Sequence, residues 1–267
     1  MSSNRLRGAA LAAAFAALAV ACSTVPITGR KQINFVPAAQ ELSLGAEAYA
    51  EVLKENKVTT NARYTEIVRR VANRITPVTD EPDLPWEVNV IESNEMNAFC
   101  LPGGKIAFYT GILPVCATEA GVAVVMGHEI AHAIARHGME RMSQGVIAQI
   151  GAEAIGIATK GSAYQKEIMA AYGLGANYGV MLPFSRTHES EADHIGIIYM
   201  AKAGYDPAEA VRFWQRFGGE KAGSAPPEWL STHPSDETRV SQLQALLPEA
   251  EAIYEAAPKQ YGLGEKL

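Results

Sequence analysis

The 267-residue sequence is poor in several residue types, and each shortage excludes a class of protein. Three cysteines are too few for a scaffold built on disulfides. A net charge of −6 gives no basic excess, so nucleic acid is not an expected partner. The uncharged stretches 8–21 and 168–185 are too short or too rich in glycine for us to expect a membrane-spanning helix. A 48% hydrophobic composition without internal repeats instead suits one compact domain.

The first 22 residues have the form of a bacterial export signal. Arg5 and Arg7 precede an apolar, alanine-rich stretch, and Cys22 follows it. The residues LAVAC at 18–22 resemble a lipoprotein signal, in which the cysteine is acylated, although alanine stands at position 19 where leucine is usual. We therefore expect a signal peptide at 1–21, a tether at 22–38 and a folded domain at 39–267. An ordinary secretory signal without lipid is the alternative.

Export also bears on the charge and on the other two cysteines. Removing residues 1–21 takes away two arginines and no acidic residue, which leaves 21 basic against 29 acidic residues and a net charge of −8. In an oxidising compartment Cys100 and Cys116 are expected to form a disulfide. Two buried free thiols are the alternative.

The residues VVMGHEIAHAIARHG at 124–138 carry the strongest chemical signal. On a helix, His128 and His132 leave the same face about one turn apart, so they can hold two positions of a tetrahedral zinc ion. Glu129 lies about 100° round the helix, where a carboxylate can act as general base in metal-assisted hydrolysis. Apolar neighbours predict that this helix, over 119–137, is buried. A chance match to the motif is the alternative.

A third metal ligand is expected from SRTHESEADHIG at 185–196. Glu189 and Asp193 share a helix face, so we assign Glu189 as the third ligand. Asp193 is then the carboxylate that accepts the second N–H of a zinc-bound histidine. His188 is the alternative ligand. Spacing gives no site role to three polar neighbours, His137, Glu191 and His194. We expect His137 and His194 to be ordinary polar residues at helix ends or on helix faces. We expect Glu191 to be a surface or structural charge.

Periodicity and turn residues outline a mainly helical α+β fold. Strands are expected at 86–91 and 105–109, with a tight turn at 102–104, as a small antiparallel sheet beside the histidine helix. An extended peptide could add to the edge of this sheet. Residues 139–183 are expected as two closely packed helices or as a flap over the cleft. The remaining predicted helices cover 40–56, 61–76, 184–203, 207 to about 217, and 238–247.

Four sequence blocks together resemble one class of enzymes, the HtpX-like and CAAX prenyl-protease class of gluzincin zinc metallopeptidases. They are NAFCLPGGKI at 97–106, HEIAH at 128–132, SRTHESEADHIG at 185–196, and THPS at 232–235 with Arg239. The resemblance covers about residues 38–247. The lipoprotein signal followed by VPITGRKQ resembles the small periplasmic lipoprotein branch, the LoiP-like proteins. The chain lacks the transmembrane helices of membrane-embedded members, and no tetratricopeptide repeats follow Leu247, which separates it from BepA-like members.

The resemblance implies a zincin-like (gluzincin) fold and an endopeptidase with one Zn²⁺ per chain. The ion would be held by His128, His132 and Glu189, with Glu129 as the catalytic base. The resemblance also suggests roles for three further residues. His233 would stabilise the oxyanion, and Asn97 would contact the substrate backbone. Arg239 would orient a loop or pair with an acid.

The resemblance further implies a location and a substrate class. If Cys22 is acylated, Ser23 stands where aspartate commonly signals retention in the inner membrane, so the resemblance implies a lipid anchor on the periplasmic face of the bacterial outer membrane. Misfolded or unassembled cell-envelope proteins are the expected substrates. The rival interpretation is a lipoprotein chaperone or outer-membrane assembly scaffold with a structural zinc. Glu129 favours the enzyme, because a purely structural site needs no base beside the metal.

Overall fold

The computed structural model describes residues 22–267 except 163, 167, 171–181 and 220–236. In these residues the fold is mainly helical with two small sheets, so the predicted α+β class is confirmed. The strands are β1 (Cys22–Thr24), β2 (Lys31–Ile33), β3 (Glu87–Ile91), β4 (Ala98–Leu101) and β5 (Lys105–Tyr109). The α-helices are α2 (Ala38–Glu55), α3 (Ala62–Ile75), α4 (Leu113–Cys116), α5 (Glu119–Ile134), α6 (His137–Ala158), α8 (Leu182–Lys202), α9 (Ala208–Gly219) and α11 (Glu237–Glu255).

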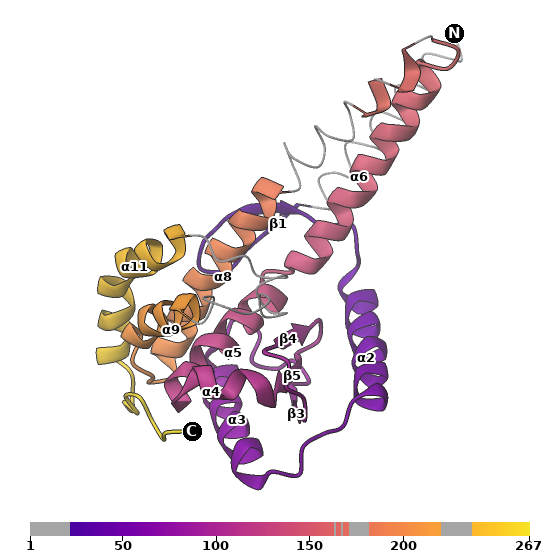
Figure 1. The fold of residues 1–267 in the computed structure, drawn as a ribbon. Coiled ribbons are helices and arrows are strands. Elements are labelled where there is room, and N and C mark those ends of the chain that lie inside the picture. The colour runs from indigo at the N-terminus through magenta and orange to yellow at the C-terminus, as the bar shows by residue number, and fades with distance from the viewer. Residues whose placement is uncertain (1–21, 163, 167, 171–181, 220–236) are drawn as a thin grey trace.

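Helix α5 forms the centre of the molecule, between the β3–β5 sheet and helices α8, α9 and α11 (Figure 1). Every residue of α5 except His132 and Ala133 is buried, as its apolar sequence predicts. The Thr118 side chain accepts a hydrogen bond from the Gly121 backbone N–H and caps the helix. The backbone carbonyl groups of Glu265 and Leu263, near the C-terminus of the chain, accept hydrogen bonds from the N–H groups of Glu119 and Ala120 in the first turn. The first turn of the histidine helix is therefore held both by a capping side chain and by backbone carbonyl groups near the C-terminus.

The larger sheet has the strand order β3-β5-β4. Strands β4 and β5 are antiparallel and are joined by the predicted turn, in which Gly103 and Gly104 adopt φ values of +78° and +74°. Strand β3 is instead parallel to β5, so the sheet is mixed and only one of its two strand pairs has the antiparallel pairing that we expected. This order leaves β4 at the edge of the sheet, next to α5.

Helices α5 and α8 approach each other closely where two glycines face each other. A Cβ atom on Gly127 would lie 2.8 Å from the carbonyl oxygen of Gly196, a distance that forces the backbones apart. Gly127 directly precedes His128, so this contact sets how near the two helices can bring their polar side chains.

We expect Gly127→Ala to lower the free energy of unfolding by about 1–3 kcal/mol through overpacking. Gly145→Ala is the matched control, because Gly145 lies within α6 and a Cβ atom there would meet nothing within 4 Å. In urea titrations the control should gain up to about 1 kcal/mol from helix propensity. Equal stability of the two variants would show that the α5–α8 contact tolerates a methyl group.

The predicted histidine helix ends earlier than we expected. It stops at Ile134, Arg136 adopts a left-handed φ of +56°, and α6 begins at His137. Helix α6 then projects from the body as one continuous arm (Figure 1). Large apolar side chains are exposed along it: Met142, Val146, Ile147, Ile150 and Ile157. The rest of the predicted helix pair or flap at 139–183 includes residues outside the described chain.

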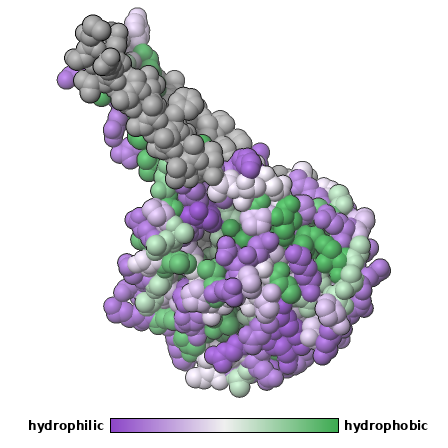
Figure 2. Space-filling view, turned by 180° about the vertical axis from the view of Figure 1, so that it is seen from behind, coloured by the Kyte–Doolittle hydropathy of each residue, from purple (hydrophilic) through white to green (hydrophobic). Residues whose placement is uncertain are grey.

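Outside the arm, the visible face of the body mixes hydrophilic and hydrophobic residues (Figure 2). Among the described helices, none is both long enough and apolar enough to cross a membrane.

The segment expected as a tether forms a hairpin. Strands β1 and β2 pair antiparallel, with Cys22 opposite Ile33. The turn between them carries Thr28 and Arg30, whose side chains bond to carboxylates on α6 and α8. The hairpin therefore lies against the two helices that flank α5.

The predicted disulfide is wrong, because Cys100 and Cys116 are both free. Cys100 lies on β4, where burial and the nearby Glu129 raise the pKa of its thiol. Cys116 is buried at the end of α4, where burial also raises the pKa of its thiol and the charges of Arg216 and Glu209 act on it in opposite directions. The two thiols thus have different neighbours, one facing the sheet side of α5 and the other facing α9.

Candidate metal centre

Three of the predicted ligands come together at the junction of α5 and α8. Nε2 of His128 lies 3.1 Å from Nε2 of His132, and the Glu189 carboxylate lies 3.4 Å from each of these nitrogens. A tetrahedral zinc with ligands at about 2.0–2.1 Å requires separations of about 3.3 Å between ligand atoms. In the described residues these three side chains also form the group of potential ligands whose atoms lie within 4.8 Å of one another. The donor set therefore fits zinc.

The other ring nitrogen of His128 has a carboxylate partner, as we expected for Asp193. Nδ1 of His128 lies 2.9 Å from Oδ1 of Asp193. Burial disfavours the charged form of His128, but Asp193 and Glu189 together raise its pKa to about 9 in the metal-free protein. This contact leaves Nε2 directed to Glu189 and His132.

Arg239 of α11 holds both carboxylates of this junction. Its guanidinium donates to Asp193 at 2.7 and 2.6 Å and to Glu189 at 3.2 Å, and it is 2% exposed. Burial alone would raise the pKa of Asp193, but Arg239 beside it holds the pKa below its usual value. Of the two roles that we considered for Arg239, its contacts are those of a residue that pairs with acids.

Glu129 follows His128 on α5 and is buried beside an open groove. The groove has a volume of about 420 Å³ and runs between the edge strand β4 and the α5–α6 junction. Glu129 and His132 are among its polar lining residues, and Phe99, Leu101 and Met142 are among its apolar ones. A carboxylate next to the candidate metal ligands therefore faces a space that an extended chain can enter.

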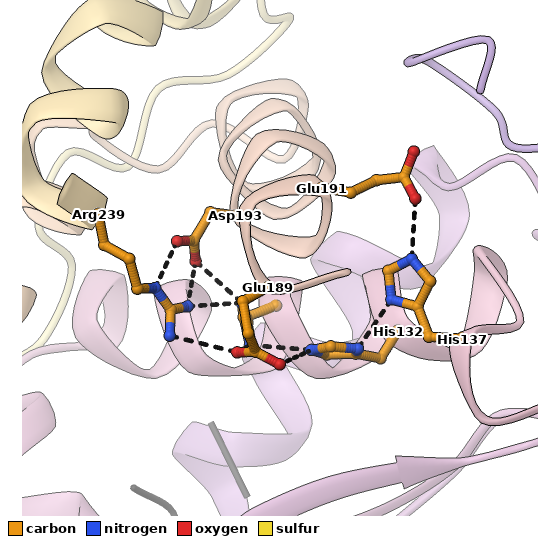
Figure 3. A network of polar contacts seen from close by, with 7 residues as sticks. His132, His137, Glu189, Glu191, Asp193 and Arg239 are labelled. Carbon is orange, nitrogen blue, oxygen red and sulfur yellow. Dashed lines mark hydrogen bonds and ion pairs between the residues drawn. The ribbon is translucent and has the colours of Figure 1, made fainter. Parts of the chain in front are cut away.

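Sequence reasoning missed a second polar cluster next to His132. Nδ1 of His137 lies 2.8 Å from Nδ1 of His132, and Nε2 of His137 lies 2.9 Å from Glu191 (Figure 3). Burial lowers the pKa of His137 to about 4, so the ring is neutral near pH 7. Glu191 is 6% exposed, so it is not a surface charge. Burial opposes its ionisation, but bonds from His137, Thr28 and Arg30 lower its pKa to about 2.

The other predicted site residues lie apart from the three ligands or outside the described residues. His188, the alternative ligand, contacts Glu140 at 2.9 Å and is not in the ligand group. Asn97 is half-buried just before β4, and the groove lining begins two residues later. The Nε2 atom of His194 lies 3.7 Å from Glu249. His233 lies outside the described residues.

Comparison with known proteins agrees with this geometry. The family model "Peptidase family M48" matches residues 59–247. The chain is 35% identical over 241 residues to mitochondrial metalloendopeptidase OMA1 of Schizosaccharomyces pombe, covering 87% of this chain and 68% of that protein. It is 32% identical over 251 residues to human metalloendopeptidase OMA1, covering 86% and 47%. It is also 32% identical over 209 residues to the putative beta-barrel assembly-enhancing protease of Vibrio cholerae, covering 76% and 43%.

The chain thus spans about two thirds of the fission-yeast relative and about half or less of the other two. The family match covers most of the chain and includes both helices of the candidate metal centre. The chain therefore belongs to peptidase family M48 and is a metalloprotease.

Proposed function

We propose that this protein is a zinc-dependent endopeptidase that hydrolyses peptide bonds of misfolded or unassembled cell-envelope proteins. One observation carries the proposal: three ligand atoms lie 3.1–3.4 Å apart, and Glu129, next to His128 in sequence, lines an open groove together with His132. The similarity to a beta-barrel assembly-enhancing protease supports a role in the envelope. A scaffold with a structural zinc does not explain the base and the groove.

The described residues can divide the reaction among them. Zinc, when held by His128, His132 and Glu189, supplies Lewis-acid chemistry that polarises the peptide carbonyl and the attacking water. Glu129 accepts a proton from that water and passes it to the leaving amine. The edge of β4 offers backbone N–H and C=O groups to an extended substrate, since within the described chain no strand pairs with that edge.

The proposed location follows from the N-terminal sequence. A lipid on Cys22 would anchor the domain to the periplasmic face of the outer membrane, as in the LoiP-like branch. Because β1 begins at Cys22, the anchor would be attached directly to the folded hairpin. Mass spectrometry of the mature protein should find a diacylated or triacylated Cys22 as the first residue. If the first residue of the mature protein is an unmodified residue other than Cys22, the lipid anchor has to be dropped from the proposal.

Metal content and proteolysis of an unfolded substrate test the enzyme. We expect Glu189→Ala to lose most bound zinc and most casein hydrolysis, because a third of the protein ligands is gone. Asp193→Asn should retain more zinc than Glu189→Ala, with affinity reduced about 10–100-fold, because it alters a partner of His128 and of Arg239 but removes no ligand. Full zinc content in Glu189→Ala, measured by atomic emission after dialysis, would contradict the assignment.

A further inference from the structure

The break between α5 and α6 gives His132 a neighbour that a continuous helix could not. Five residues further along one helix, a side chain points about 140° away. Here Arg136 adopts a left-handed backbone conformation, and the Nδ1 atoms of His132 and His137 lie 2.8 Å apart. Arg136 is itself held by hydrogen bonds to Glu41 and to the Val36 carbonyl. The turn therefore has its own support and brings His137 back to the candidate ligand.

The contacts of His137 define which nitrogen of His132 carries the proton. Nε2 of His137 lies 2.9 Å from Glu191, and an ionised carboxylate only accepts, so this nitrogen is the donor. A His132 that binds a metal through Nε2 carries its proton on Nδ1. That Nδ1–H donates to Nδ1 of His137, which leaves the lone pair of His132 Nε2 facing Glu189 and His128.

Glu191 is held in turn by the N-terminal hairpin. Nε of Arg30 donates to Glu191 at 2.8 Å, and the Thr28 hydroxyl donates to the same carboxylate. The other two nitrogens of Arg30 donate to Glu140 at 2.9 and 2.7 Å. The two carboxylate side chains are 4% and 5% exposed, whereas Arg30 is 20% exposed. One arginine from a distant part of the sequence thus bridges two buried acids beside His137.

The ring of His137 is also fixed by stacking. His188 lies parallel to it, with ring centroids 4.2 Å apart and an interplanar angle of 13°. His188 is positioned by Glu140, the second acid that Arg30 binds. The hairpin therefore constrains His137 both through Glu191 and through the Glu140–His188 pair.

We propose that His137, Glu191 and Arg30 are positioning residues for His132, so that the hairpin at residues 22–33 is an integral part of the metal centre. His128 has an acid and an arginine behind it, Asp193 and Arg239; His132 has the same arrangement with His137 inserted. The inference rests on the proposed zinc site. It adds that the segment directly after Cys22 controls the affinity for zinc.

The test compares zinc affinity in three purified full-length variants by competition with a chromophoric chelator. His137→Phe keeps an aromatic ring but removes the acceptor for His132, and Arg30→Gln removes the cation from both acids. Arg212→Gln is the control, because Arg212 also pairs with two carboxylates, Asp206 and Glu209, but on α9 and its N-terminal turn. We expect zinc dissociation constants to rise about 10–100-fold in the first two variants and to stay within about twofold in the control.

A second readout separates positioning from general stability. In ¹⁵N-histidine NMR spectra of the metal-free protein, His132 should be the Nδ1–H tautomer in wild type and a tautomer mixture in His137→Phe. His137→Gln, whose side-chain carbonyl can accept from Nδ1–H, should recover most of the zinc affinity.

Unchanged zinc affinity in His137→Phe and Arg30→Gln would overturn the inference but leave the zinc site and the proposed function intact. Should His137→Phe fail to fold, the result for Arg30→Gln decides. A wild-type protein that binds no zinc would overturn both.

Discussion

Replacing Glu129 by glutamine should reduce casein hydrolysis by about 10²–10⁴-fold while zinc stays bound. The magnitude is that of removing a general base from a hydrolytic site. The amide keeps the size of the side chain but cannot take a proton from water. Glu129 is not in the group of three ligand atoms, so zinc content by atomic emission should match the wild type. Initial rates at saturating substrate report the loss.

The matched control for this experiment is Glu153→Gln. Glu153 is an exposed acid on the α6 arm, and the substitution removes the same charge far from the groove lining. It should hydrolyse casein at the wild-type rate. If Glu129→Gln were equally active, Glu129 would not be the base, and hydrolysis would have to be assigned to other residues.

Among the proposed substitutions, Arg239→Met should cause the largest loss of stability. In the metal-free protein it should lower the free energy of unfolding by about 3–5 kcal/mol. Asp193 and Glu189 are 6% and 3% exposed, and without Arg239 their buried charges lose their arginine partner. The guanidinium also lies 3.7 Å from the centre of the Trp214 ring, a contact that methionine replaces only in part. Urea denaturation of the zinc-free protein measures the effect. Saturating zinc should recover part of the loss, because the ion supplies a new positive charge to Glu189.

Arg216→Met is the comparison for that variant. Arg216 pairs with Glu209, but it is 36% exposed, and Glu209 keeps Arg212 as a second partner. We expect a loss of at most about 1 kcal/mol. A loss for Arg239→Met no larger than this would mean that the acids are satisfied without the arginine.

Much of the centre could be predicted because its residues follow helical spacing. His128 and His132, and likewise Glu189 and Asp193, are four residues apart on single helices, so the sequence predicts which side chains share a face. That the two faces meet depends on tertiary packing. The packing is permitted by the contact between Gly127 and Gly196. In the sequence, these two glycines cannot be distinguished from glycines without such a contact, such as Gly145.

The residues behind His132 could not be predicted in the same way. His137 contacts His132 only because Arg136, a residue type that rarely adopts positive φ, turns the chain between α5 and α6. Arg30 meets Glu191 across 161 residues, from a segment whose prolines and glycine suggested a tether. The parallel pairing of β3 with β5 was missed for a related reason, since a local turn predicts only the β4–β5 hairpin.

The contact between Gly127 and Gly196 has a consequence for how the enzyme acquires its metal. Backbone packing of α5 against α8, rather than coordination, sets the separation of the two ligand-bearing faces. Loading of zinc into the folded apoenzyme is then a local exchange of protons for the ion, without a folding step. Removal by a chelator should accordingly be reversible and leave the far-ultraviolet circular dichroism unchanged, in contrast to small zinc domains that unfold without their metal.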